Sequence, residues 1–254
     1  MALCGVMKVV ISPRKVVQIL LLGLLLLSCA SVAGHFLRQV SWVGEDLRTG
    51  LRPLFDTTSI AINDKSIGTW YSSFLLLFSS VLLAIIARAK KAGGEPYSRH
   101  WAALSIIFLF LSIDEVATLH EALGSLVDEL ASIWGFTLKG FFSYGWIVLG
   151  VVFVLIVLLS YLKFLYHLPK KTLLLFLGAG ALFVGSALGF EMLEAEMVYV
   201  SERGADVSNT LLLVNFYAEE VIETGGEIMF IYALLSYMRS YVEELNIHIG
   251  LKDD

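Results

Sequence analysis

Long apolar runs recur along the chain, and short polar stretches separate them. A helix needs about 20 apolar residues to cross the hydrocarbon core of a bilayer, and six runs approach that length. All four prolines lie outside these runs, so no predicted helix needs a proline kink. The pattern predicts membrane-crossing helices at 16–36, 67–88, 101–122, 141–163, 172–193 and 211–238.

The composition supports this interpretation. Of the 254 residues, 57% are hydrophobic and only 16% are charged, and the mean hydropathy is +0.79. Soluble domains are about a quarter charged, so a water-soluble enzyme, a disordered chain and a nucleic-acid binder are all excluded. Two cysteines do not make a disulfide framework. We predict an all-α, polytopic membrane helix bundle that forms a single membrane domain over residues 1–254.

The basic residues predict the orientation of this bundle. Twelve Lys and Arg residues fall in the N-terminal arm, in the loops after the second and fourth helices, and at the C-terminal end, whereas six fall in the other loops. Lys and Arg accumulate on the cytoplasmic side of membrane proteins. We therefore expect both termini in the cytoplasm and the loops after the first, third and fifth helices outside.

The first apolar segment allows two interpretations. Lys8, Arg14 and Lys15 precede a shorter apolar run and small residues, as in a cleaved signal peptide. An uncleaved helix is favoured, because the apolar character continues through Leu37 and reaches spanning length. The loop at 37–66 carries apolar residues at helical spacing, which predicts an amphipathic helix on the outer surface, either as a connector or as a lid.

Acidic residues lie at overlapping depths in three predicted helices. The helix at 101–122 starts on the cytoplasmic side, so Asp114 lies about 20 Å into the membrane at 1.5 Å per residue. The fifth helix brings Glu191 to the outer boundary, and the sixth places Glu223 and Glu227 between that boundary and the midplane. We expect these carboxylates to meet.

These acids need a neutralising partner. No Lys or Arg lies between Arg99 and Lys139 or between Lys171 and Arg203, and a charged carboxylate in the bilayer centre costs several kcal/mol. Protons, a bound cation or a water-filled funnel can stabilise them, although acids near the membrane ends can simply reach the headgroups. The predicted metal ligands are Asp114, Glu191, Glu223 and Glu227. The predicted rim comprises Glu115, Thr118, His120, Glu121, Glu194, Glu219 and Glu220.

Carboxylate oxygens suit a divalent ion such as Mg²⁺, Mn²⁺, Ca²⁺, Fe²⁺ or Zn²⁺, and one imidazole favours a transition metal. Three functions remain open. The first is a membrane metalloenzyme that acts on a lipid-like, amphipathic substrate. The second is a transporter coupled to a cation or to protons, and the third is a non-catalytic interaction protein. The inner halves of the acidic helices are apolar, which favours a site open on one side over a conduit. The partners expected are the lipid bilayer and such a substrate or cation, and not nucleic acid.

The segment Ser112-Ile113-Asp114-Glu115, followed by His120-Glu121, resembles a signature of uncharacterised bacterial multi-pass membrane proteins, in which Ser-Leu-Asp-Glu precedes His-Glu. The resemblance covers about ten residues of one helix. It implies a location in the bacterial inner membrane and carries no activity with it.

Overall fold

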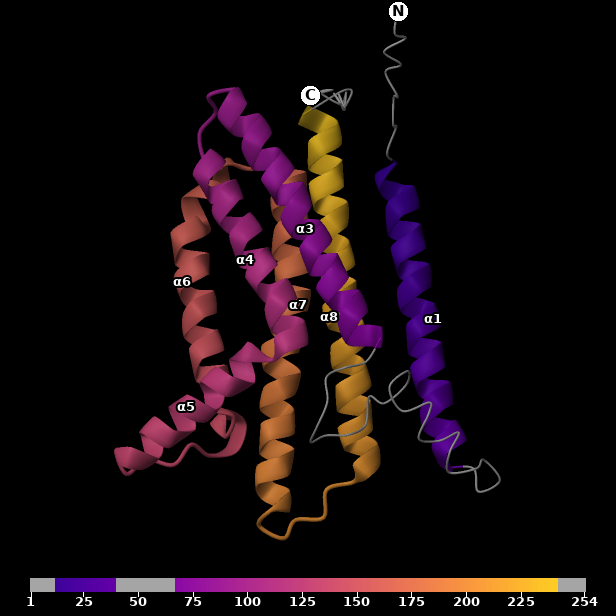
Figure 1. Cartoon of the computed structure of the whole chain (residues 1–254), viewed down its shortest axis with the longest axis vertical. Helices are drawn as coiled ribbons and strands as arrows, with labels where there is room; N and C mark the ends of the chain where they lie inside the picture. Colours follow the sequence, from indigo (N-terminus) through magenta and orange to yellow (C-terminus); the bar gives the residue numbers. More distant parts are fainter. Residues whose placement is uncertain (1–11, 40–66, 242–254) are drawn as a thin grey trace, which may run out of the picture.

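The computed structural model describes residues 12–39 and 67–241, and these residues form helices and connecting turns (Figure 1). Most of the surface helix predicted at 37–66 lies outside the described residues. The helices are α1 (Pro13–Gln39), α3 (Ile67–Ala92), α4 (Ser98–Ala117), α5 (Leu119–Ile133), α6 (Gly145–His167), α7 (Lys170–Ser201) and α8 (Asn209–Tyr241), with a short 3-10 helix, η1, at Gly140–Phe142.

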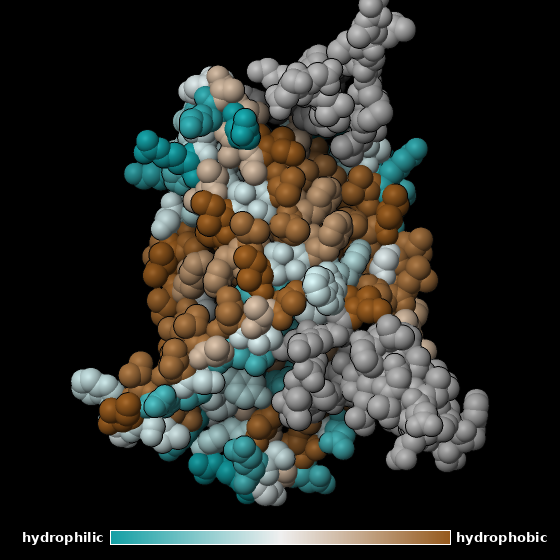
Figure 2. Space-filling view, viewed as in Figure 1, coloured by the Kyte–Doolittle hydropathy of each residue, from teal (hydrophilic) through white to brown (hydrophobic). Residues whose placement is uncertain are grey.

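Every long helix except α5 is apolar enough to cross a membrane, which gives six candidate spans among the described residues. The predicted all-α membrane bundle is thereby confirmed. Helices α1 and α8 carry the two ends of the chain on the same side of the bundle (Figure 1), as an even number of crossings requires. On the face shown in Figure 2, apolar side chains form a band across the middle, with hydrophilic side chains toward both ends.

One predicted helix ends earlier than expected. The run at 101–122 was expected to be continuous, but α4 ends at Ala117 and Thr118 adopts a left-handed conformation with φ 47°. A β-branched residue is rarely found there, because its side chain crowds the backbone. The chain turns sharply at Thr118, and α5 leaves the bundle sideways (Figure 1).

Serine pairs join α3 to α4. Ser73 Oγ donates to the Ser112 carbonyl at 2.7 Å, and Ser112 Oγ donates back to the Ser73 carbonyl at 2.9 Å. Two turns further along, Ser80 and Ser105 exchange the same two bonds. Small polar side chains let helices approach closely in lipid and hydrogen-bond across the interface. These pairs hold the start of α3 beside the end of α4.

A close glycine contact joins α7 to α8. A Cβ on Gly226 would lie 2.7 Å from the Phe183 backbone nitrogen and 3.1 Å from the Ala179 carbonyl oxygen. The two helices can therefore approach this closely only because residue 226 has no side chain. Asn215 Nδ2 donates to the Phe190 carbonyl at 3.1 Å and adds a second link between the helices.

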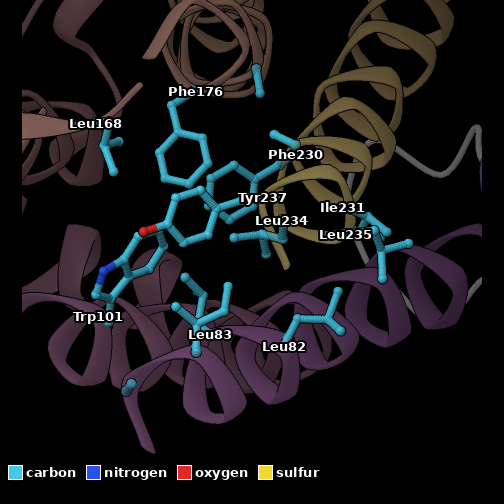
Figure 3. Close-up of a cluster of buried hydrophobic side chains, with 14 of the residues drawn as sticks. Leu82, Leu83, Trp101, Leu168, Phe176, Phe230, Ile231, Leu234, Leu235 and Tyr237 are labelled. Carbon is cyan, nitrogen blue, oxygen red and sulfur yellow. The ribbon is translucent and has the colours of Figure 1, made fainter. Parts of the chain in front are cut away.

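The apolar core lies at the end of the bundle where α3, α6 and α8 finish and α4 and α7 begin. Trp101 is 1% exposed and packs its ring on Phe176 and Tyr237 (Figure 3). Leu83 and Leu234, both fully buried, complete the contact between α3 and α8. This aromatic core closes one end of the bundle, and the acidic residues lie toward the other.

Candidate functional site

The start of α3, the end of α4, the outer half of α7 and the first half of α8 meet at the end of the bundle opposite the aromatic core. Pairs of helices bring them together through the serine and glycine contacts described above. The side chains gathered there are almost all carboxylates. We call this group the carboxylate cluster: Glu115, Glu191, Glu194, Glu219, Glu220, Glu223 and Glu227.

Glu227 is the deepest member. Its side chain is 1% exposed, and its Oε1 accepts a hydrogen bond from Ser72 Oγ at 2.7 Å. Its Oε2 is buried and has no hydrogen-bond partner within the described part of the chain. Buried polar atoms are nearly always hydrogen-bonded, and an orphaned carboxylate oxygen is among the most costly exceptions. Glu227 therefore requires a positively charged or hydrogen-donating partner at Oε2.

Ser72 serves two carboxyl groups at once. Besides its bond to Glu227, it lies within hydrogen-bonding range of Glu115. A serine hydroxyl has a single hydrogen to donate, although its oxygen can also accept. Ser72 can therefore bond both groups only if one of them carries a proton, and otherwise one carboxylate needs another positive partner.

The remaining glutamates extend the cluster toward the end of the bundle. Glu223 interacts electrostatically with Glu115, Glu220 and Glu191. Glu219 lies one turn nearer the start of α8 and interacts with Glu191 and Glu194 of α7. Like charges repel, and this repulsion is strong where water is excluded. A continuous row of mutually repelling groups thus leads from the end of α7 to the buried Glu227.

Asp114 and His120 form a separate pair at the edge of the cluster. Asp114 Oδ1 accepts from the backbone N–H of His120 at 2.8 Å, and Asp114 Oδ2 lies 2.9 Å from His120 Nδ1. The carboxylate thereby satisfies a free N–H in the first turn of α5. It also lies at the positive end of that helix dipole.

His120 stands in a strongly acidic environment. Burial lowers the pKa of its imidazole, but the hydrogen bond to Asp114 and the charges of Asp114, Glu191 and Glu121 outweigh it, so the pKa is raised above its usual 6.5. The ring also packs edge-on against Trp146 of α6, with centroids 4.9 Å apart. A protonated His120 is thus a cation supplied by the chain itself, next to the cluster.

Tyr144 marks the outer edge of the cluster at the start of α6. Its hydroxyl donates to Glu194 Oε1 at 3.5 Å. Burial, followed by the charges of Glu194 and Glu191, raises the pKa of this phenol. Tyr144 therefore stays a neutral hydrogen-bond donor to the acidic residues.

The predicted site residues fall into distinct places. Glu223 and Glu227 lie in the deep part of the cluster with Glu115 and Glu220, whereas Glu191, Glu194 and Glu219 lie in its outer part. The rest surround the break between α4 and α5: Asp114 pairs with His120, Thr118 forms the turn, and Glu121 lies exposed in the first turn of α5.

Sequence reasoning missed Ser72 and Tyr144. A signal for Ser72 existed, since Ser72-Ser73 and Ser79-Ser80 interrupt an otherwise apolar run at a spacing of seven residues. Tyr144 had no comparable signal, because tyrosine is common at the ends of membrane helices.

Metal-binding geometry is not preformed in the described residues, where no group of three or more His, Cys, Asp or Glu side chains is arranged to hold a metal ion. The cluster is held mainly by packing of the helices on one another, and its glutamates have three rotatable side-chain bonds each. What the arrangement offers chemically is a dense set of carboxylate oxygens, and the acidic stretches 112–121, 189–196 and 219–227 contain no Lys or Arg.

A family model described as a domain of unknown function (DUF8692) matches residues 19–238. No curated protein and no solved structure matches the chain.

Proposed function

The chain belongs to the DUF8692 family, and we propose that it binds a cation at the carboxylate cluster within the membrane. The buried, unpartnered Oε2 of Glu227 carries this proposal. Glu115 and Glu223 lie close enough to Glu227 to interact with it electrostatically. The stretches of chain that carry these acids contain no Lys or Arg, and in this proposal a cation bound from outside the protein supplies the positive charge that Glu227 Oε2 needs.

A divalent metal is the cation that the donor set favours. Carboxylate oxygens are hard ligands that suit a divalent ion, and two ionised carboxylates balance its double charge. Glu223 and Glu227 would be ligands as the sequence predicts, and Glu115 would join them. Asp114 is bonded to His120 and would orient the edge of the site instead. Binding would require small rotations of the glutamate side chains, since no three of them converge in the described structure.

The aromatic core supports a site open on one side. Trp101, Phe176 and Tyr237 lie between the cluster and the far end of α8, with the rings of Phe176 and Tyr237 packed on that of Trp101. A conduit needs polar stations through the whole membrane. This arrangement favours metal-dependent chemistry on a lipid-like, amphipathic substrate, with a carboxylate of the outer part as general acid or base.

A proton-coupled transporter is the second candidate. The shared hydroxyl of Ser72 favours it, because one proton on Glu115 or Glu227 would complete the hydrogen bonds of both groups. On either proposal the protein resides in a membrane, and the resemblance of its Ser-Ile-Asp-Glu segment favours the bacterial inner membrane.

Metal analysis of the detergent-purified protein tests the proposal. We expect close to one divalent ion per chain in the wild type and its loss in Glu227→Gln and Glu223→Gln. Glu129→Gln is the matched control, because Glu129 is exposed on α5 outside the cluster. A cation that binds only the folded state stabilises it by about 2.7 kcal/mol at 100 times its Kd. Added Mn²⁺ or Mg²⁺ should therefore raise the thermal midpoint of the wild type and of Glu129→Gln, but not that of Glu227→Gln.

Two results would separate the candidates. If none of the divalent ions binds or raises the midpoint of the wild type, the metal site is rejected. If, in addition, the wild type takes up protons on acidification and Glu227→Gln does not, the proton-coupled function replaces the metal-site proposal.

A further inference from the structure

Helix α5 exposes a continuous apolar stripe that the fold does not use. Leucines at 119, 123, 126 and 130 and Ile133 follow one another at steps of four and three residues, which places them on one face of a helix. All five side chains are exposed, and Ile133 is 71% exposed. Trp134 and Phe136 follow directly and are exposed as well.

The opposite face of α5 holds the helix against the bundle. Gly124 is buried, and a Cβ there would lie 2.8 Å from the backbone nitrogen of Trp146. Asp128 lies on this side near Gly145, where its carboxylate faces the positive end of α6. Ser132 is exposed on the polar side. The orientation of α5 about its own axis is therefore set, with the apolar stripe turned away from the protein.

The position of α5 places this stripe at the level of a membrane surface. Helix α4 ends at Ala117 and α6 begins at Gly145, so α5 leaves the bundle where two membrane-crossing segments reach their limit (Figure 1). The two neighbouring helices also expose apolar side chains near the ends that flank α5, with Ile113 on α4 and Leu149 on α6 both exposed. Near the tip of α5, at the lower left of Figure 2, apolar side chains adjoin the hydrophilic end of the molecule.

We propose that α5 lies along the membrane surface on the side of the carboxylate cluster, with its apolar stripe inserted among the lipid chains. Its partner is the bilayer itself, because the two membrane-crossing helices that flank α5 also expose apolar side chains near these ends. Exposed Trp and Phe at its end are typical of the interface between lipid and water.

The charge of α5 is unusual for a helix that lies on a membrane surface. Surface helices commonly use Lys and Arg to bind anionic lipids, but residues 119–138 contain none, whereas Glu121, Asp128 and Glu129 are acidic. Insertion therefore depends on burial of the apolar stripe alone. A zwitterionic lipid surface is the chemistry that fits, since anionic headgroups would repel the helix.

Depth measurements with single fluorescent labels test this inference. In a background of Cys4→Ser and Cys29→Ser, cysteine replaces Leu126 or Leu130 on the stripe, or Ser132 on the polar side as the control. Each variant carries an environment-sensitive NBD label and is reconstituted in phosphatidylcholine vesicles. We expect brominated acyl chains to quench the labels at 126 and 130 at least twofold more than the label at 132. Iodide on both sides of the membrane should quench the label at 132 more than the labels at 126 and 130.

Equal quenching by iodide at 126, 130 and 132 would overturn the proposal, since α5 would then lie in water. Labels on the stripe that neither quencher reaches would overturn it too. In that case a second copy covers the stripe, and disulfide crosslinking between Leu126→Cys chains would show it. Stronger lipid quenching after addition of phosphatidylglycerol would contradict the preference for a zwitterionic surface. None of these readouts depends on cation binding, so they stand apart from the test of the cluster.

Discussion

Lys90 and Glu227 are buried ionisable residues at opposite ends of the bundle, and they differ in how their polar atoms are paired. Lys90 is 6% exposed beside the aromatic core and bonds the carboxylate of Glu95 five residues away. Glu227 is buried at least as well, yet one of its oxygens has no partner in the described structure. A buried charge that is paired is stable, whereas an unpaired one costs several kcal/mol. The imbalance is confined to the carboxylate cluster.

The pair of Asp114 and His120 predicts a dependence of stability on pH. The pKa of His120 in the folded protein lies above its usual value of 6.5, so the folded state binds the proton more tightly than the unfolded chain does. This contribution to stability is complete below about pH 6.5 and is lost as the pH rises through the higher folded pKa. We expect the thermal midpoint of the wild type to fall as the pH rises above about 6.5, and the midpoint of His120→Gln to fall less over the same range.

His167→Gln is the control for that measurement, because His167 is exposed at the end of α6, away from Asp114. It should keep the slope of the wild type. Identical slopes for the wild type and His120→Gln would contradict the stabilising role of the protonated pair.

At the scale of the elements, the contact between α7 and α8 brings the outer and deep glutamates together. Two adjacent glycines give a matched test, because a Cβ on Gly226 would meet the α7 backbone, whereas a Cβ on Gly225 would meet nothing within 4 Å. Gly226→Ala should destabilise the protein by about 1–3 kcal/mol through overpacking. Gly225→Ala should stabilise it by up to about 1 kcal/mol through helix propensity.

Unfolding of both variants in detergent by a denaturant, followed by circular dichroism, measures the difference. A Gly226→Ala protein as stable as the wild type would mean that the two helices are not in close contact at this point. Equal losses in both variants would point to a general intolerance of α8 rather than to a helix contact.

Depth along the helices was predictable from the sequence, whereas the break in α4 was not. A rise of 1.5 Å per residue is enough to align acids on separate helices, and Glu223 and Glu227 do lie among carboxylates from other elements. The prediction of a continuous helix failed beyond Ala117, because the turn at Thr118 and Leu119 contains no glycine or proline that would have indicated it. Asp114 caps the next helix as a result, and this follows only from the three-dimensional path of the chain.

The whole molecule combines an even number of crossings with a biased distribution of basic residues, and both bear on its orientation. Cysteine placed at Ser208, in the turn between α7 and α8, should react with an impermeant maleimide added outside intact cells. Cysteine at Lys170, the first residue of α7, should react only after the membrane is permeabilised. The reverse pattern would invert the predicted orientation and place the carboxylate cluster on the cytoplasmic side.

At this scale the fold class needed little beyond composition and the length of the apolar runs, because a bilayer leaves helices as the main solution for such segments. The relative positions of the helices needed more. Ser72 meets Glu227 because serine pairs dock α3 on α4 and α3 also packs on α8, and no spacing along the chain reveals such contacts between distant residues.

The aromatic core has a consequence for how the protein can move. Interlocked rings around Trp101 fasten α4, α6, α7 and α8 at one end, whereas at the other end α4, α7 and α8 carry the glutamates of the carboxylate cluster. At the acid end the serine pairs hold α3 on α4 and the Gly226 contact holds α7 on α8, so any movement there would fall between these two pairs of helices. We therefore expect access to Glu227 to depend on movement between these pairs, with the aromatic core unchanged at the opposite end.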